Sequence, residues 1–566
     1  MARATMQPSG SSVRVLALAA CLAVAAVGFP VASQAQTRER PLPALAGGAD
    51  DALSRALAEG RVSEAQYALE RALSLFQLAR VRREFGDVER PARRDATLLL
   101  RDLAARKREL YGPERELAEA LLARPDDGDV PIGNGWNGVP EAAGSPVCSA
   151  LPGTGLCLHW VDAGPDAPSP DDVSPANGVP DWVDIALATW ENAWAQEIAA
   201  IGYRAPLADG ALGGDARLDV YVDDLGVDAV FGYCTSDDPG VDAPGDFDVW
   251  AYCVVDDDYA PAQYGAAHTP QEFLEVTSAH EFNHASQFAY DWLEDVWLLE
   301  GTATNVEETV YPAVDDNVAF LRDVSPLTHP GLPLDRGGFS DSEYGSWIFW
   351  RFLEETIAGG DPTIVREVWE RADASSAAAF GDQYSLQAAR TELAERGHIF
   401  RNAFARFATA NRLRDYDDAA TAGYPVPPRT AAYSVGPQNR RIPWRSWRIN
   451  HLAARFFSFQ PSSTGPANAR LRLDFHLPVH GARATVVVVN RDGTVVRKRL
   501  NQGASGRIRW GVPFGRLQVA RVHLVLSNGS VRMSCWRAVG PPTYSCLGLP
   551  LDDGRVFSFS AQLVRL

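Results

Sequence analysis

The feature that most constrains this chain is the pentapeptide HEFNH, which begins at His280. Thr269 followed by Glu272 has the pattern of a capping box, so a helix is predicted to begin there and to run through both histidines. Positions four apart differ by roughly 40° around a helix, so His280 and His284 project from one face and can reach one metal ion. Glu281 lies roughly 100° from His280, where it can contact a metal-bound water without being a ligand. The pattern predicts a Zn²⁺ site.

A third ligand is expected from a second helix that follows a short turn. The sequence EDVWLLEGTA, residues 294–303, places Glu300 before small residues, which would let this helix approach the first one closely. A three-histidine site would need a histidine six residues after His284, and that position is Tyr290. The sequence therefore favours two histidines and Glu300. The plain alternative is a surface helix with hydrogen-bonded histidines and a glutamate that caps or pairs.

Carboxylates often accept a hydrogen bond from the second ring nitrogen of a zinc-binding histidine and so fix its orientation. Glu307 and Glu308 follow Glu300 in the same predicted helix. Both are candidates for this role, and the sequence does not choose between them.

The first residues predict export. Arg3 and Arg14 precede an apolar run, and small residues near Ala35 offer a cleavage site, so residues 1–35 are predicted to be a signal peptide. The run is shorter than the roughly 20 residues of a membrane-spanning helix. The residues before Cys21 resemble a lipoprotein box, but the apolar run continues past it. This favours a secreted protein, extracellular or periplasmic, over a lipid-anchored one.

Cysteine usage agrees with export. Of the seven cysteines, all but Cys21 lie beyond the signal peptide, and an even number in an exported chain predicts disulfides. A cysteine-ligated metal site would need C-x-x-C spacing, which is absent. Nearest-neighbour bonding is predicted for three pairs: Cys148 with Cys157, Cys234 with Cys253, and Cys535 with Cys546.

Charge divides the chain into modules. The net charge is −19, yet residues 125–439 carry 53 acidic against 14 basic side chains, and residues 440–566 carry 20 basic against 4 acidic. Asymmetry of this size indicates separate domains. The basic domain is predicted either to dock on the acidic one or to tether the protein to a polyanionic surface. No sequence-specific nucleic acid partner is expected.

Secondary-structure patterns change at similar places. Leucines at mixed three- and four-residue spacing predict helices in residues 36–124, and Pro, Gly and Asp then mark a boundary. Residues 147–430 mix helices with strands. Residues 440–566 predict strands, including a hairpin around Asp492 and Gly493, and an all-β sandwich is the expected architecture.

Five aspartates form a second candidate cation site. Carboxylate oxygens suit Ca²⁺, but no loop has the spacing of an EF-hand. A solvated acidic surface is therefore favoured over a calcium site. The residues are Asp223, Asp224, Asp256, Asp257 and Asp258.

The stretch from HEFNH, at residues 280–284, to WLLEGTAT, at residues 297–304, resembles gluzincin-type zinc metallopeptidases. In that family a glutamate on the next helix completes the zinc site of the two histidines. Further motifs across residues 147–360, such as NGVPDWVD and YGSWIFWRFLEE, resemble a family of predicted secreted bacterial metalloproteases. The resemblance implies an α+β zincin catalytic domain in residues 147–430, with the N-terminal helices acting as a propeptide. It also implies that Tyr344 stabilises the oxyanion, whereas a tyrosine packed on the core is the alternative.

Together the patterns predict a secreted zinc metalloendopeptidase, which cleaves protein or peptide substrates through a zinc-bound water activated by Glu281. The exopeptidase motif of zinc aminopeptidases is absent, which favours endopeptidase action. The alternative is a non-catalytic surface-binding protein on a degenerate zincin core, which would have no need of Glu281. A glycan-directed enzyme is a third class, but neither paired carboxylates nor an aromatic signature supports it.

Overall fold

A computed structural model gives the structure of residues 42, 45, 50–91, 94, 96–127, 135–238, 240, 247–337, 342–537 and 543–564. The predicted signal peptide, with Cys21, lies outside these residues. The residues from 41 to 566 belong to one compact unit. The division into domains stays a prediction.

Short helices make up the N-terminal region. They are α1 (Ala52–Ala58), α2 (Glu64–Phe76), α3 (Leu78–Phe85), α4 (Ala96–Arg106) and α5 (Pro113–Leu121). Ser63 and Gln66 form a capping box that fixes the start of α2. Helix α4 is buried along its whole length and lies against strand β4 (Gly232–Thr235) of the central sheet. Apolar packing therefore joins this region to the centre of the molecule.

The central region contains a five-stranded mixed sheet. Its strands are β1 (Val147–Cys148), β2 (Leu156–His159), β3 (Leu218–Asp223), β5 (Tyr252–Asp256) and β4. They lie in the order β1-β2-β3-β5-β4, in which β3 is parallel to β2 and β5, and β4 is antiparallel to β5. Two of the predicted disulfides join neighbouring strands, Cys148 to Cys157 and Cys234 to Cys253. Strand β4 is thus an edge strand that is linked covalently to its neighbour.

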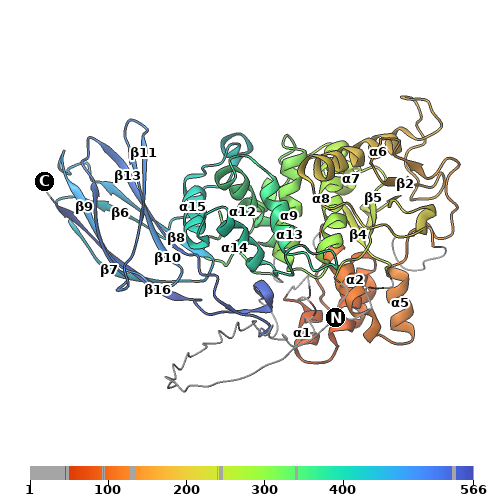
Figure 1. Ribbon diagram of the computed structural model, residues 1–566, viewed down its shortest axis with the longest axis horizontal. Helices are drawn as coiled ribbons and strands as arrows, with labels where there is room; N and C mark the ends of the chain where they lie inside the picture. Colours follow the sequence, from red (N-terminus) through yellow and green to blue (C-terminus); the bar gives the residue numbers. More distant parts are fainter. Residues whose placement is uncertain are drawn as a thin grey trace, which may run out of the picture. The chain divides into compact units, whose positions relative to one another are not determined.

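Helices pack on this sheet and continue beyond it (Figure 1). They are α6 (Asp181–Trp194), α7 (Pro261–Tyr264), α8 (Pro270–Asp291), α9 (Val296–Val310), α10 (Val318–Arg322), α11 (Ser342–Gly345), α12 (Trp347–Phe352), α13 (Thr363–Arg371), α14 (Leu386–Glu395) and α15 (Phe400–Leu413). Helix α6 continues into a π-helical stretch, Ala195–Ile201. Helix α8 contacts β4, β5, α6 and α9, and is therefore the central element of this region.

The C-terminal region is built of strands, as expected. One sheet has the order β11-β10-β13-β8-β6, and the other has the order β12-β9-β16-β7. Apolar side chains from both sheets form a single core. The strands are β6 (Ala431–Val435), β7 (Arg441–Ile449), β8 (Ala453–Pro461), β9 (Arg470–His476), β10 (Ala482–Asn490), β11 (Val495–Leu500), β12 (Arg507–Pro513), β13 (Val519–Asn528) and β16 (Arg555–Val564), with the short pair β14 (Met533–Ser534) and β15 (Leu549–Pro550).

Helix α15 lies against strands β8, β10 and β13 of the larger C-terminal sheet. Ala408 of this helix packs in one buried apolar cluster with Phe456 and Val525. Gly529 follows β13 and lies against α15, where a Cβ atom would be 2.9 Å from Phe404 Cβ. The third predicted disulfide, Cys535 to Cys546, is also present. Within the described residues, no helix combines the length and apolar character that crossing a membrane requires.

Candidate metal centre

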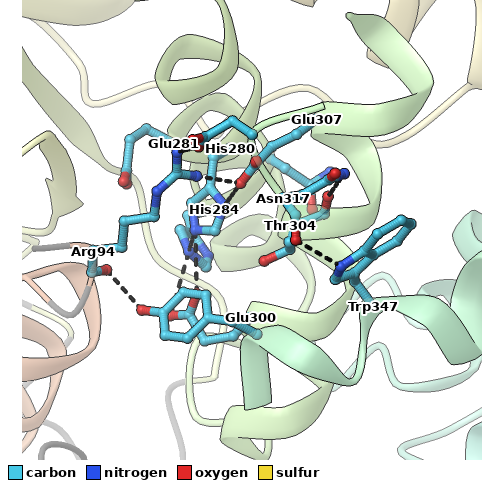
Figure 2. A network of polar contacts seen from close by, with 12 residues as sticks. Arg94, His280, Glu281, His284, Glu300, Thr304, Glu307, Asn317 and Trp347 are labelled. Atoms are coloured by element: carbon cyan, nitrogen blue, oxygen red, sulfur yellow. Dashed lines mark hydrogen bonds and ion pairs between the residues drawn. The ribbon is translucent and has the colours of Figure 1, made fainter. Parts of the chain in front are cut away.

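Two consecutive helices supply the candidate ligands. Thr269 and Glu272 form the predicted capping box at the start of α8, and the helix carries His280 and His284 through the middle of the molecule. After a short turn, α9 brings Glu300 back to them (Figure 2). A Cβ atom on Gly301 would lie 2.7 Å from the indole nitrogen of Trp350, so only glycine lets α9 and α12 approach this closely.

The candidate donor atoms converge, and we call His280, His284 and Glu300 the histidine–glutamate cluster. The Nε2 atoms of the two histidines lie 3.0 Å apart. Glu300 Oε2 is 3.1 Å from His280 Nε2, and Glu300 Oε1 is 3.6 Å from His284 Nε2. Tetrahedral zinc with ligands at 2.0–2.1 Å holds neighbouring donor atoms roughly 3.3 Å apart. The donor set and its spacing therefore fit a zinc ion.

Hydrogen bonds fix both imidazole rings from behind. His280 Nδ1 lies 2.7 Å from Glu307 Oε1, and His284 Nδ1 lies 2.7 Å from Gln287 Oε1. Because these partners are acceptors, each Nδ1 carries a proton, so that with a metal bound each Nε2 would offer its lone pair to the ion. Gln287 is itself oriented by donating to Leu299 O at 3.1 Å. Of the two glutamates that the sequence left open, Glu307 contacts a histidine.

The cluster is buried and strongly polar. Burial alone would lower the pKa of His280, but its hydrogen bonds with Glu300 and Glu307 outweigh this effect and raise the pKa to about 10. Burial opposes ionisation of Glu300, yet its electrostatic interaction with His284 and its hydrogen bonds with both histidines lower its pKa to about 2. A proton and a metal ion would therefore compete for the same place between these side chains.

The predicted base and the predicted oxyanion donor both contact the N-terminal region. Glu281 Oε2 accepts a hydrogen bond from the Thr97 hydroxyl at 2.7 Å. The Thr97 oxygen accepts one from the backbone N–H of Cys234 at 2.9 Å. Tyr344, whose ring centroid is 6.2 Å from that of His280, donates its hydroxyl to the backbone oxygen of Arg94 at 2.8 Å. The sequence analysis did not predict a role for Thr97, Arg94 or Gln287. Only Gln287 could have been found from the sequence, because it lies one helical turn after His284.

The second candidate cation site is only partly assembled. Asp224, Asp256 and Asp257 bring carboxylate oxygens within 4.8 Å of one another, and we call them the acidic cluster. Asp223, Asp256 and Asp257 are buried, Asp224 is half-buried and Asp258 is exposed. The solvated surface that the sequence favoured is therefore wrong for the three buried aspartates. Both Asp256 oxygens already accept hydrogen bonds: Oδ1 from the N–H of Gly226 and the hydroxyl of Tyr264, Oδ2 from the N–H groups of Asp258 and Tyr259.

Comparison with known proteins gives no family for this chain. No protein family and no curated protein matches the sequence. Among solved structures, the pre-peptidase C-terminal domain of a collagenase from Bacillus anthracis aligns at 8% identity and a TM-score of 0.15, covering 24% of this chain and 96% of that chain. The VP2 subviral particle of infectious bursal disease virus aligns at 12% identity and a TM-score of 0.11, covering 22% of this chain and 30% of that chain.

A GH115 4-O-methyl-alpha-glucuronidase with specificity for decorated arabinogalactans aligns at 11% identity and a TM-score of 0.13, covering 54% of this chain and 40% of that chain. Likenesses of this size carry no argument about fold or activity. The gluzincin resemblance therefore stays a prediction from motifs, and the functional argument depends on the geometry of the site.

Proposed function

We propose that this protein is a secreted zinc-dependent metalloendopeptidase of the gluzincin type. The observation that carries the proposal is the histidine–glutamate cluster, in which both Nδ1 atoms are held by acceptors and both Nε2 atoms face Glu300. A pair of surface histidines would have neither the burial nor the fixed tautomers. The three disulfides support an oxidising compartment, in agreement with the predicted signal peptide.

His280, His284 and Glu300 would hold the zinc ion through three protein atoms, which leaves a fourth position open. Bound there, zinc would lower the pKa of a water molecule toward ~7 and polarise the peptide carbonyl. Glu281 follows His280 on α8 and would take a proton from the attacking water, then pass it to the leaving amine. Tyr344 would donate its hydroxyl to the carbonyl oxygen as negative charge develops there.

The same contacts support a latent form. In the described chain Glu281 accepts a hydrogen bond from the Thr97 hydroxyl, and Tyr344 donates one to the backbone oxygen of Arg94. All four residues are buried. A substrate would need both groups. The N-terminal helices would therefore have to leave or shift before catalysis, which agrees with their predicted role as a propeptide. Mass spectrometry of the active secreted form should find an N-terminus beyond Arg124, and an active form that begins near Gln36 would contradict latency.

The proposal is tested by metal analysis and cleavage of casein. The purified protein should contain about one zinc per chain, and a chelator should abolish cleavage. Glu281→Gln should keep its zinc and lose roughly 10²–10⁴-fold in rate, because only the proton transfer is removed. Glu275→Gln, the same change elsewhere on α8, is the matched control and should keep full activity. Full activity in Glu281→Gln would sink the mechanism, and bound zinc without cleavage in any processed form would favour the non-catalytic alternative.

A further inference from the structure

The side chain of Arg94 is buried beside the histidine–glutamate cluster, between two acidic and two aromatic side chains. Its Nη1 lies 2.5 Å from Glu307 Oε1, and its Nη2 forms an ion pair with Asp316. The rings of Phe231 and Phe320 lie 5.2 and 5.6 Å from its guanidinium carbon. We call the site formed by these four side chains the arginine pocket. Arg94 is only 6% exposed, and Figure 2 shows its side chain reaching toward Glu307 next to His280.

Arg94 and Thr97 contact the groups that a substrate would need. The Arg94 carbonyl oxygen accepts the hydroxyl of Tyr344, the predicted oxyanion donor. Three residues later, the Thr97 hydroxyl donates to the base Glu281 and accepts the N–H of Cys234 on the edge strand β4. Arg94 and Thr97 thus together meet the oxyanion donor, the base and the edge strand. An ion pair that only fastened the N-terminal region could lie anywhere along the contact with the central region.

We propose that the arginine pocket is the substrate-binding site for an arginine side chain, on the residue whose carbonyl oxygen Tyr344 holds, and that Arg94 occupies it as a built-in substrate mimic. This inference rests on the proposed peptidase function and adds a substrate class to it: peptides cleaved on the carboxyl side of arginine.

The chemistry of the pocket selects arginine over lysine. Two carboxylates from different positions meet two different nitrogens of the planar guanidinium, a geometry that the single ammonium of lysine cannot match. The two aromatic rings suit a flat, weakly hydrated cation. A buried ion pair contributes little net stability because both charges lose their hydration. Recognition of a particular side chain explains such a costly arrangement better than fastening does.

The first test measures binding to the full-length, zinc-loaded chain and does not depend on catalysis. N-acetyl-arginine amide should not bind the wild type, whose pocket is filled. It should bind Arg94→Ala roughly 10–100-fold more tightly than N-acetyl-norleucine amide does, because charge-assisted hydrogen bonds form in a buried site. Arg83→Ala removes an exposed arginine of α3 and should behave as the wild type. Arg94→Ser also empties the pocket and replaces the alanine variant if that variant does not fold. Equal binding of the two amides would contradict the proposal that this site binds an arginine side chain.

The second test maps the bonds in casein that are cleaved by the processed, active form, which has lost Arg94 together with the N-terminal helices. Arginine should precede the cleaved bonds, and Asp316→Asn in this form should lower the ratio of kcat/KM for arginine over leucine peptides roughly tenfold. Asp323→Asn, an exposed acid of the same region, should leave the ratio unchanged. Cleavage without a preference for arginine would overturn this inference and leave the peptidase function standing. Binding of the arginine amide without any cleavage would overturn the peptidase function and leave an arginine-binding site.

Discussion

The histidine–glutamate cluster and the acidic cluster both gather metal-binding side chains within a few ångströms, but they differ in what their donor atoms already do. In the first, Glu307 and Gln287 hold the outer nitrogens of the histidines and leave the inner ones facing Glu300. In the second, both oxygens of Asp256 accept hydrogen bonds from groups around it. The comparison teaches that residue types alone do not define a metal site. The donor atoms must also converge on one point, and they must not already accept hydrogen bonds from the surrounding protein.

The most direct test of this difference is to remove one candidate ligand from the histidine–glutamate cluster. Glu300→Gln replaces the anionic ligand with a neutral amide and should cost zinc affinity more than the roughly 10–100-fold expected for a residue that only orients a ligand. Casein cleavage should fall with the zinc content, measured by atomic emission. Asp224→Asn is the matched change in the acidic cluster and should keep about one zinc per chain. Zinc loss in both variants would contradict the distinction.

A smaller effect is expected from the residue behind His280. Glu307→Gln keeps the side-chain shape but weakens the acceptor for the Nδ1 proton, so zinc affinity should fall roughly 10–100-fold in competition with a chelator. Glu308→Gln is the control, because Glu308 instead accepts a hydrogen bond from Asn317 at 3.4 Å. If both variants bind zinc equally well, the hydrogen bond behind His280 does not tune the site.

The acidic cluster should matter for folding and not for zinc. Asp256→Asn would turn an amide N–H₂ toward at least one buried donor, and the free energy of unfolding should fall by about 1–3 kcal/mol in urea. Zinc content should not change. Tyr264→Phe removes a single donor to Asp256 and should cost less. An Asp256→Asn variant that is as stable as the wild type would show that these hydrogen bonds do not fix the loop.

A further effect is expected on the pH dependence of stability. Burial and the neighbouring charges of Asp256, Asp258 and Asp224 raise the pKa of Asp257 from its usual 3.8 to about 8. A raised pKa means that this group's contribution to stability is fully present below about pH 4 and is lost as pH rises through about 8. Asp257→Asn should therefore be more stable than the wild type at pH 8, and the difference should shrink toward pH 5. Urea midpoints across this range measure it.

The same experiment decides the question of calcium. Added Ca²⁺ that stabilises the wild type at pH 8, but not Asp257→Asn, would show that the acidic cluster binds the ion despite its committed oxygens. Parallel pH profiles for the two proteins, with or without calcium, would instead show that Asp257 neither causes the pH dependence of stability nor binds calcium.

Local patterns in the sequence predicted the elements that carry the site. The capping box and the histidine spacing concern one helix, and three short-range cysteine pairs needed no knowledge of the fold. The choice of Glu307 over Glu308 was also within reach, because Glu307 lies two helical turns after Glu300 and faces the same way. Thr97 was out of reach, because it meets Glu281 only through tertiary packing of α4 on β4.

Charge asymmetry was a weaker guide to the C-terminal region. Apolar side chains occupy the contact of α15 with the larger sheet, and the ion pair of Arg497 with Asp415 at 2.8 Å is half exposed at both ends. Burial, together with the like charges of Arg429 and Arg521, lowers the pKa of Arg412 on α15 to about 10. The ion pair of Arg497 with Asp415 is therefore too exposed to add much to the contact. Attachment to a polyanionic surface stays a prediction, and binding to anionic liposomes at low and high salt would check it.

Strand β4 closes one side of the central sheet, and its outer edge is covered. Cys234 stands opposite Cys253 with the Cα atoms 4.1 Å apart, the short separation of a pair whose backbone groups point away from each other. Its N–H therefore faces Thr97 on α4. Once the N-terminal helices leave, this edge would be open to any extended chain, including another copy of the protein. Removal of the helices would then give access to substrate but would also make the protein more prone to aggregate. Before their removal, the helices would protect the edge strand from pairing with other chains.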